Sequence, residues 1–172
     1  IENARLQTDP SIELDIHMDN DIYVLAHPLE LSRAVQNLFT NAQRYGRSED
    51  GQLRLHIVLQ RIDNGKTAEL SVGDEGRGLP VEERERVMRP FERGESARSG
   101  VTGTGLGLAI VDRIVRRSGG SVHLDTYPAH GLLVLVRFPI TTPEEHKAQT
   151  EKAQKVAEKL EKKRQKEAKK SA

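Results

Sequence analysis

The chain has no cysteine and no tryptophan, and only three phenylalanines and three tyrosines among its 172 residues. The lack of cysteine excludes disulfides and thiolate metal sites, and it suits a reducing compartment. With so few aromatic rings, the core has to be mostly aliphatic. No apolar run is long enough to span a bilayer, and the first residues do not form a signal-peptide pattern. Because the net charge is only +1, it gives no global argument for nucleic-acid binding.

The composition changes along the chain, and this change predicts two parts. A length of 172 residues suffices for one well-buried core and an appendage. After Pro139 the residues become mostly Lys, Glu, Ala and Gln, so we predict a folded domain over 1–140 and a charged tail over 141–172. These residue types favour helix, and Pro143 suits a first helical position, so we expect the tail to be helical or disordered. Because the sequence starts without Met, we also expect a fragment of a longer protein.

Six segments have the alternating or compact apolar patterns that predict β-strands. They cover residues 12–18, 22–25, 53–61, 68–73, 122–126 and 132–138. Helical spacing of apolar residues predicts long helices over 28–45 and 106–117, with one short helix near residue 81. The sequence Asp63-Asn64-Gly65 predicts a tight hairpin turn. We therefore expect an α/β two-layer sandwich, in which about three helices pack against a mixed, largely antiparallel sheet of about five strands.

Three alternating glycines, Gly103, Gly105 and Gly107, precede the second long helix. Glycine lets backbone N–H groups approach a ligand closely, and a helix N-terminus carries partial positive charge, so this arrangement favours a phosphate. The spacing differs from the G-x-G-x-x-G dinucleotide fingerprint, and the chain has no P-loop motif. Taken alone, the glycines would fit a flexible loop equally well.

Asp74 follows the predicted strand 68–73 and precedes two further glycines, Gly76 and Gly78. A carboxylate held at a strand end can accept a hydrogen bond from an exocyclic amine such as that of adenine. The two glycines would let the chain turn tightly beneath the ring. Alone, the pattern also fits an ordinary turn that begins with aspartate.

Asn37 and Asn41 are four residues apart, so they share one face of the first long helix. Their neutral oxygens suit Mg²⁺ when the phosphates of a ligand supply the charge. Arg44 and Tyr45 follow one turn later and offer a cation for phosphate and a flat, hydrogen-bonding ring. A polar, exposed face of an amphipathic helix is the alternative interpretation.

Phe91 lies among charged residues, in Arg89-Pro90-Phe91-Glu92-Arg93-Gly94. A permanently exposed Phe is costly, so we expect it to anchor a mobile lid. From such a lid, Arg93 and Arg98 would reach the oxygens of a transferring phosphate. A surface loop packed by a single Phe is the alternative.

Together and in this order, the motifs resemble the catalytic, ATP-binding domain of the sensor histidine kinases, within the superfamily that includes gyrase, the Hsp90 chaperones and MutL. The resemblance covers residues 12–139. The segments 33–35, 44–46 and 90–98 look especially like the osmosensor-type subgroup. The resemblance rests on an asparagine box at Asn37 and Asn41, a first glycine box at Asp74, Gly76 and Gly78, a phenylalanine box at Phe91, and a second glycine box from Gly103 to Gly107.

The resemblance implies a Bergerat-type (GHKL) sandwich that binds ATP and Mg²⁺, with residues 92–104 as the ATP lid. By this analogy Asp74 reads the adenine amine, Asn41 and Asn37 hold Mg²⁺, and Tyr45 packs on the base. Arg44 and Arg93 contact the phosphates. The implied catalytic set is Asn37, Arg93 and Arg98, and the implied nucleotide-binding set is completed by Gly76, Gly78, Phe91, Thr102, Gly103, Thr104, Gly105, Leu106, Gly107 and Leu108.

One departure from the wider superfamily is informative. Its ATP-hydrolysing members carry a glutamate, which activates water, where this chain has Asn37. An amide cannot accept that proton, so the resemblance implies transfer to a histidine on a separate dimerisation domain. None of the six histidines here lies in the H-E-x-[RK]-x-P segment of such a domain, and we expect His17, His27 and His56 to be structural.

The resemblance also implies a response regulator as downstream partner, and a cytoplasmic location on a bacterial parent kinase of the inner membrane. We expect the fragment itself to be monomeric, because the family's dimer contacts lie elsewhere. Three other functions stay open at this point. They are a nucleotide-dependent regulatory binding module without phosphoryl transfer, a serine kinase of the anti-sigma-factor type, and a structural domain with a basic nucleic-acid arm. Interleaved Lys and Glu argue against the last, and no nucleic-acid partner is expected.

Overall fold

The computed structural model describes residues 10–92, 105–128, 130–145, 147–148, 150–152, 154–156 and 159. The chain divides into two compact units, residues 1–140 and 141–172. The described part of the first unit contains three helices and a five-stranded sheet. The strands are β1 (Ile12–Met18), β2 (Leu53–Ile62), β3 (Thr67–Asp74), β4 (Ser121–Tyr127) and β5 (Gly131–Pro139), and the helices are α2 (Pro28–Tyr45), α3 (Val81–Val87) and α4 (Gly107–Arg117).

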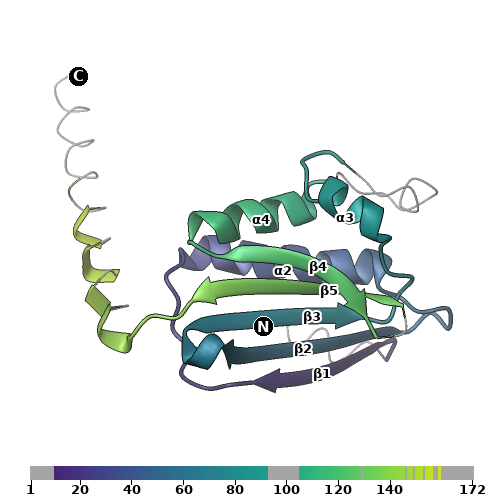
Figure 1. Cartoon of the computed structure of the whole chain (residues 1–172), viewed down its shortest axis with the longest axis horizontal. Coiled ribbons are helices and arrows are strands. Elements are labelled where there is room, and N and C mark those ends of the chain that lie inside the picture. The colour runs from purple at the N-terminus through teal and green to yellow at the C-terminus, as the bar shows by residue number, and fades with distance from the viewer. Residues whose placement is uncertain are drawn as a thin grey trace. The chain divides into compact units, whose positions relative to one another are not determined.

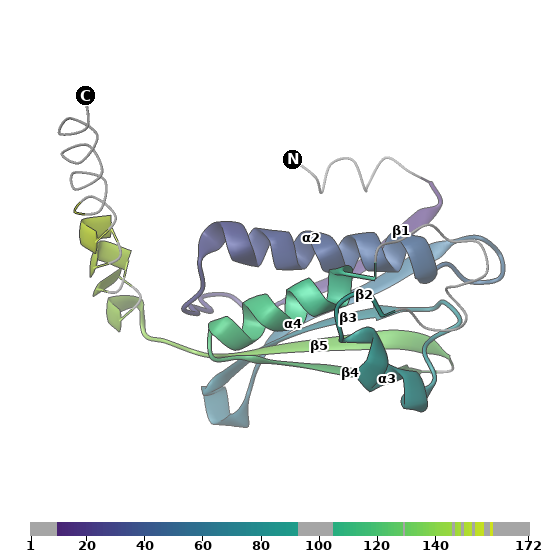
Figure 2. The same ribbon diagram turned by 90° about the horizontal axis from the view of Figure 1, so that it is seen from above.

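The sheet has the strand order β1-β2-β3-β5-β4 (Figure 1). β1 pairs with β2 in parallel, whereas the three other pairs are antiparallel. Figure 2 shows α2 and α4 side by side over one face of this sheet. The predicted fold class is therefore confirmed: a two-layer α/β sandwich with a mixed, largely antiparallel sheet.

The core between the two layers is almost entirely aliphatic. Leu53 and Leu55 of β2 and Val111 and Val115 of α4 are its most deeply buried large side chains. Among the described residues that are buried and apolar, Phe138 is the only aromatic one. Helical spacing places the apolar residues of α2 and α4 on the face that meets the sheet, and their burial stabilises both helices.

One local expectation differs from the structure, and another is confirmed with an added detail. Residues 22–25 do not form a strand; only Val24 makes a bridge, to Ile140. This segment lies between Asp21, which has φ 58°, and the helix that starts at Pro28, so it is too short to extend the pairing. The predicted hairpin turn does join the antiparallel strands β2 and β3, and it contains a 3-10 turn, Asp63–Gly65, in which all three residues have positive φ.

The second unit begins with a reciprocal helix cap. The backbone N–H of Thr142 donates to Glu145 Oε2 at 3.0 Å, and the N–H of Glu145 donates to Thr142 Oγ1 at 3.1 Å. This capping box satisfies two N–H groups at the helix start, and the described residues from Pro143 to 159 are helical. Within the described part of the chain, every helix is too short or too polar to cross a lipid bilayer.

Candidate functional site

Asp74 is the last residue of β3, and the residue is only 5% exposed. Its Oδ1 accepts hydrogen bonds from the backbone N–H groups of Gly76 at 3.0 Å and Leu132 at 3.2 Å. Burial raises the pKa of Asp74, and these two N–H donors oppose that shift. Because both bonds use Oδ1, Oδ2 is left to accept a hydrogen bond from a ligand donor.

Backbone segments from three elements pack around Asp74 at distances that a side chain would prevent. An ideal Cβ on Gly76 would lie 2.6 Å from the carbonyl oxygen of Tyr45, at the end of α2. A Cβ on Gly131, the first residue of β5, would collide with the carbonyl oxygen of Asp74. The end of β3 is thus fixed between α2 and β5. The sequence did not indicate Gly131 as a site residue, because only the pairing of β3 with β5 brings it next to Asp74.

Asn37 lies on the side of α2 that adjoins the start of α4. Its Nδ2 donates to the carbonyl oxygen of Arg33 at 2.8 Å, so Oδ1 is the atom left for a ligand. A Cβ on Gly107 would lie 3.7 Å from this Oδ1. Asn41 is one turn further along α2 and, like Asn37, is half-buried. The structure therefore brings an amide oxygen next to a helix N-terminus, which favours negative charge.

The described residues before α4 supply backbone rather than side-chain groups. Gly105 has φ 70°, and Leu106 is the N-cap residue of the helix. The side chain of Leu108 belongs to the hydrophobic core, so this residue can offer a ligand only its backbone. The first helical N–H groups have no partner within the helix, which makes them suitable donors to a phosphate.

A cleft of about 400 Å³ opens where α2 ends and the chain leaves β3. It brings together three of the predicted residues, Arg44, Tyr45 and Gly76. Its complete lining is Arg44, Tyr45, Arg47, Ser48, Glu49, Glu75, Gly76, Arg77 and His130. His130 had no local signal in the sequence, because it reaches the cleft only through the turn between β4 and β5. Arg77 lies between Gly76 and Gly78, so its position in the sequence could have indicated it as a site residue.

Phe91 is 77% exposed and has φ 65°, a conformation that is unusual for a bulky residue. This exposure argues against the alternative of a loop packed by one Phe. The N–H of Phe91 donates to the carbonyl oxygen of Gly105 at 3.1 Å, and this bond joins the two ends of the predicted lid. The predicted site residues Arg93, Arg98, Thr102, Gly103 and Thr104 lie outside the described residues.

A divalent cation at this site would have to be held by few protein oxygens. Among the described residues, no group of three or more His, Cys, Asp or Glu side chains is placed to hold a metal ion. Mg²⁺ accepts one or two protein oxygens when phosphates complete its shell. The Oδ1 of Asn37, which adjoins the start of α4, fits this requirement.

The fold and the site define a class of protein. A two-layer sandwich that holds a buried aspartate, a pair of helical asparagines and a glycine-led helix at one end is a nucleotide-binding ATPase-type domain. The model of the histidine kinase-, DNA gyrase B- and HSP90-like ATPase family matches residues 26–142. The chain belongs to this family.

Its relatives place it among the sensor kinases. It is 38% identical to the sensor protein kinase PmrB of Pseudomonas aeruginosa over 145 residues, which are 83% of this chain and 29% of that protein. A structure of the mycobacterial sensor histidine kinase MprB matches with a TM-score of 0.69 and 30% identity, covering 82% of this chain and 89% of that one. The full-length structure of ShkA in complex with AMPPNP matches with a TM-score of 0.62 and 26% identity, covering 76% of this chain and 26% of that one.

The chain thus spans less than a third of the length of the curated relative PmrB. It is similar to the catalytic, ATP-binding part of sensor histidine kinases, and the predicted resemblance to them is confirmed.

Proposed function

We propose that this domain binds ATP with Mg²⁺ and transfers the γ-phosphoryl group to a histidine on a separate dimerisation domain. The observation that carries the proposal is the buried Asp74, whose Oδ2 is free to accept from the 6-amino group of adenine. Membership of a family of ATPases and the similarity to ShkA, which was solved in complex with AMPPNP, support a nucleotide as the ligand.

Different residues of the chain bind the base, the Mg²⁺ and the phosphates. Asp74 accepts the hydrogen bond of the base, and Tyr45 packs on the ring from the end of α2. Asn37 and Asn41 hold Mg²⁺ through their amide oxygens, and the ion neutralises charge on the phosphates. Arg44 and the first N–H groups of α4 contact the phosphates, together with Gly76, Gly78, Phe91, Gly105, Leu106, Gly107 and Leu108 around the nucleotide. We assign Arg93 and Arg98 to the transferring phosphate, and Thr102, Gly103 and Thr104 to the lid.

Asn37 decides which acceptor the site can serve. An amide cannot take a proton from water, so this residue cannot prepare water for attack on the phosphate. A neutral imidazole needs no such base, because its ring nitrogen already carries a lone pair. The acceptor is therefore a histidine, delivered by the dimerisation domain of the same kinase.

The remaining partners follow from this reaction. A response regulator receives the phosphoryl group from the histidine, and the domain works in the bacterial cytoplasm on a parent kinase of the inner membrane. The fragment is a monomer that binds no nucleic acid.

Calorimetric titration of ATP with Mg²⁺ into the wild-type chain and into Asp74→Asn tests the nucleotide site. The substituted amide keeps an oxygen for the two backbone N–H donors but presents N–H groups to the base, where an acceptor is needed. We expect wild-type binding and a loss of about 2–3 kcal/mol, or roughly 30- to 150-fold, in the variant. Wild-type protein that binds nothing at near-millimolar ATP would contradict the proposal.

A transfer assay then tests the reaction. The wild-type chain, radiolabelled ATP and a supplied histidine-bearing dimerisation domain should yield a phosphohistidine that is labile in acid. Replacing the acceptor histidine by glutamine is the control. Nucleotide binding without transfer to any related dimerisation domain would favour a regulatory binding module instead.

A further inference from the structure

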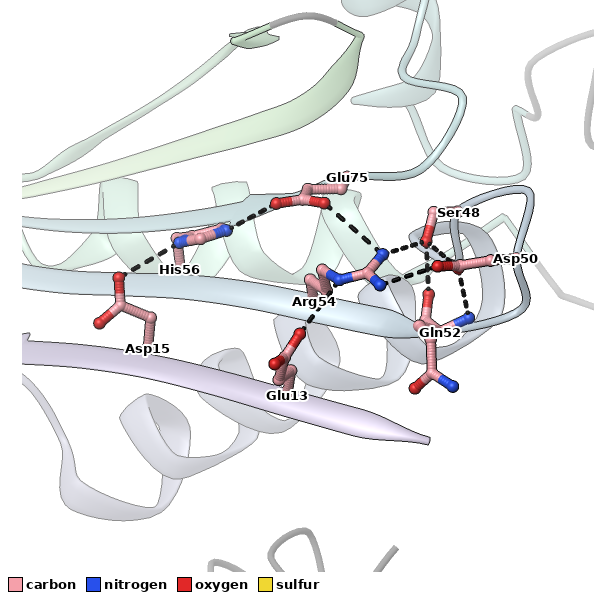
Figure 3. A network of polar contacts seen from close by, with 8 residues as sticks. All are labelled: Glu13, Asp15, Ser48, Asp50, Gln52, Arg54, His56 and Glu75. Atoms are coloured by element: carbon pink, nitrogen blue, oxygen red, sulfur yellow. Dashed lines mark hydrogen bonds and ion pairs between the residues drawn. The ribbon is translucent and has the colours of Figure 1, made fainter. Parts of the chain in front are cut away.

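The face of the sheet opposite the helices carries a polar network that reaches the nucleotide end (Figure 3). His56 of β2 joins two carboxylates of this network, with Nε2 3.0 Å from Glu75 Oε1 and Nδ1 3.3 Å from Asp15 Oδ2 of β1. Arg54, the neighbouring residue on this face of β2, is 3.8 Å from Glu75 Oε2 but is held more closely by Asp50 and Glu13. His56 therefore makes the shortest contact with the Glu75 side chain in this network.

His56 is also held by ring stacking. Its ring lies against that of Tyr127 at the end of β4, with centroids 4.9 Å apart and planes 16° apart. Tyr127 lies directly over Gly73, where a Cβ would be 2.6 Å from Tyr127 Cε2. Gly73 is in turn the register partner of His56. Contacts from β1, from Glu75 directly after β3 and from β4 thus hold the imidazole ring in position.

Consecutive residues at the end of β3 face opposite sides of the sheet. Asp74 is buried toward the helix layer, whereas Glu75 extends onto the open face and is bonded to His56. Their Cα atoms are about 3.8 Å apart, so a shift of the Glu75 backbone moves Asp74 as well. Glu75 also precedes Gly76, whose N–H donates to Asp74 Oδ1. A hydrogen bond to a base depends on placement within about 0.5 Å, so this linkage can change base recognition.

We propose that His56, through its contact with Glu75 and its stacking on Tyr127, is a positioning residue for the Asp74 carboxylate and so determines selectivity for adenine. This inference rests on the proposed nucleotide site. His56 does not touch the ligand; it holds the residue that follows the base-reading aspartate. Loss of His56 releases Glu75 and lets the turn at Gly76 relax.

The test compares ATP with ITP, which carries a 6-oxo group where ATP has the 6-amino group. Kd values for both are measured with Mg²⁺, by competition against a fluorescent ATP analogue, well below the Tm of every variant. The variants are His56→Ala, His56→Gln and Glu75→Gln, with His123→Ala as matched control. His123 is an exposed histidine on the same face, at the strand position of β4 that pairs with Leu135. Glutamine keeps a nitrogen donor as many bonds from Cβ as Nε2 is, so His56→Gln can restore the contact with Glu75.

We expect His56→Ala to weaken ATP roughly fivefold while leaving ITP unchanged, so the selectivity ratio falls roughly fivefold. His56→Gln should recover most of the ratio, Glu75→Gln should lower it less, and His123→Ala should not alter it. An unchanged ratio in His56→Ala, or an equal loss for both nucleotides, overturns the inference, because a merely structural role would give that result. Wild-type protein that binds neither nucleotide would instead overturn the proposed nucleotide site.

Discussion

Gly107, the first residue of α4, can be replaced by alanine without backbone strain. Its φ is not in the positive region, and among the described residues a Cβ there would meet nothing closer than Asn37 Oδ1 at 3.7 Å. Glycine in a helix interior costs about 1 kcal/mol relative to alanine, and at the first position we expect roughly half of that. Gly107→Ala should therefore raise the free energy of unfolding by about 0.5 kcal/mol and the Tm by about 1–3 °C.

The same methyl group should weaken nucleotide binding. It would lie between Asn37 Oδ1 and the first turn of α4, where the proposed site receives the phosphates and Mg²⁺. Loss of one charge-assisted hydrogen bond costs about 1.5–3 kcal/mol, so the Kd for ATP should rise at least about tenfold.

Thermal unfolding and calorimetric titration of ATP measure the two effects on the same sample. Arg113→Ala, at an exposed position further along α4, is a control for a change in helix propensity away from the site, and it should bind ATP normally. If Gly107→Ala were more stable and still bound ATP like the wild type, the phosphates could not approach the start of α4, and the reasoning would be refuted.

Three further predictions concern stability. Burial raises the pKa of Asp74 above its ordinary value near 3.8, so its contribution to stability is complete below that value and is lost as pH rises through the folded-state pKa. The unfolding free energy of Asp74→Asn relative to wild type should therefore increase from acid to neutral pH in urea titrations, and a flat difference would contradict this. Leu55→Ala, at a position that is 1% exposed, should lower the free energy of unfolding by about 2–5 kcal/mol, whereas Leu29→Ala, at one that is 76% exposed, should change it by less than about 0.5 kcal/mol. Phe91→Gly should raise the free energy of unfolding by about 1 kcal/mol, because φ 65° suits glycine and the ring is exposed. Phe91→Ala should not give this gain.

The main elements could be predicted from sequence because their patterns are long and strong. Apolar spacing over 28–45 and the alternation over 53–61 and 132–138 leave little choice between helix and strand. The strand predicted over residues 22–25 is absent from the structure. The composition of this segment suits a strand, but a strand also needs a neighbouring segment with which to pair. In the fold that neighbour is Ile140, far away in sequence, and it meets only Val24.

The candidate site could be predicted where its residues carry a local motif, and not where tertiary pairing brings them together. Asp74 with its following glycines, and the asparagines at helical spacing, are signals within a few residues. Gly131 and His130 come to the site because β5 pairs with β3, and their own neighbours in sequence do not indicate this. His56 was expected to be structural, and the structure shows which groups it holds.

The unfavourable local features of this domain are concentrated at one end of the sheet. Asp74 is a buried carboxyl group with a raised pKa, Phe91 is an exposed aromatic residue with positive φ, and Gly131 has a contact that no side chain would permit. The first two lower stability, the third leaves no room for a side chain, and all three lie in or beside the proposed nucleotide site. The most deeply buried apolar side chains belong to the β2 and α4 layers, whose packing is independent of any ligand. Such packing can tolerate strain at the strand ends, so substitutions that remove the strain should stabilise the empty domain while weakening its affinity for nucleotide.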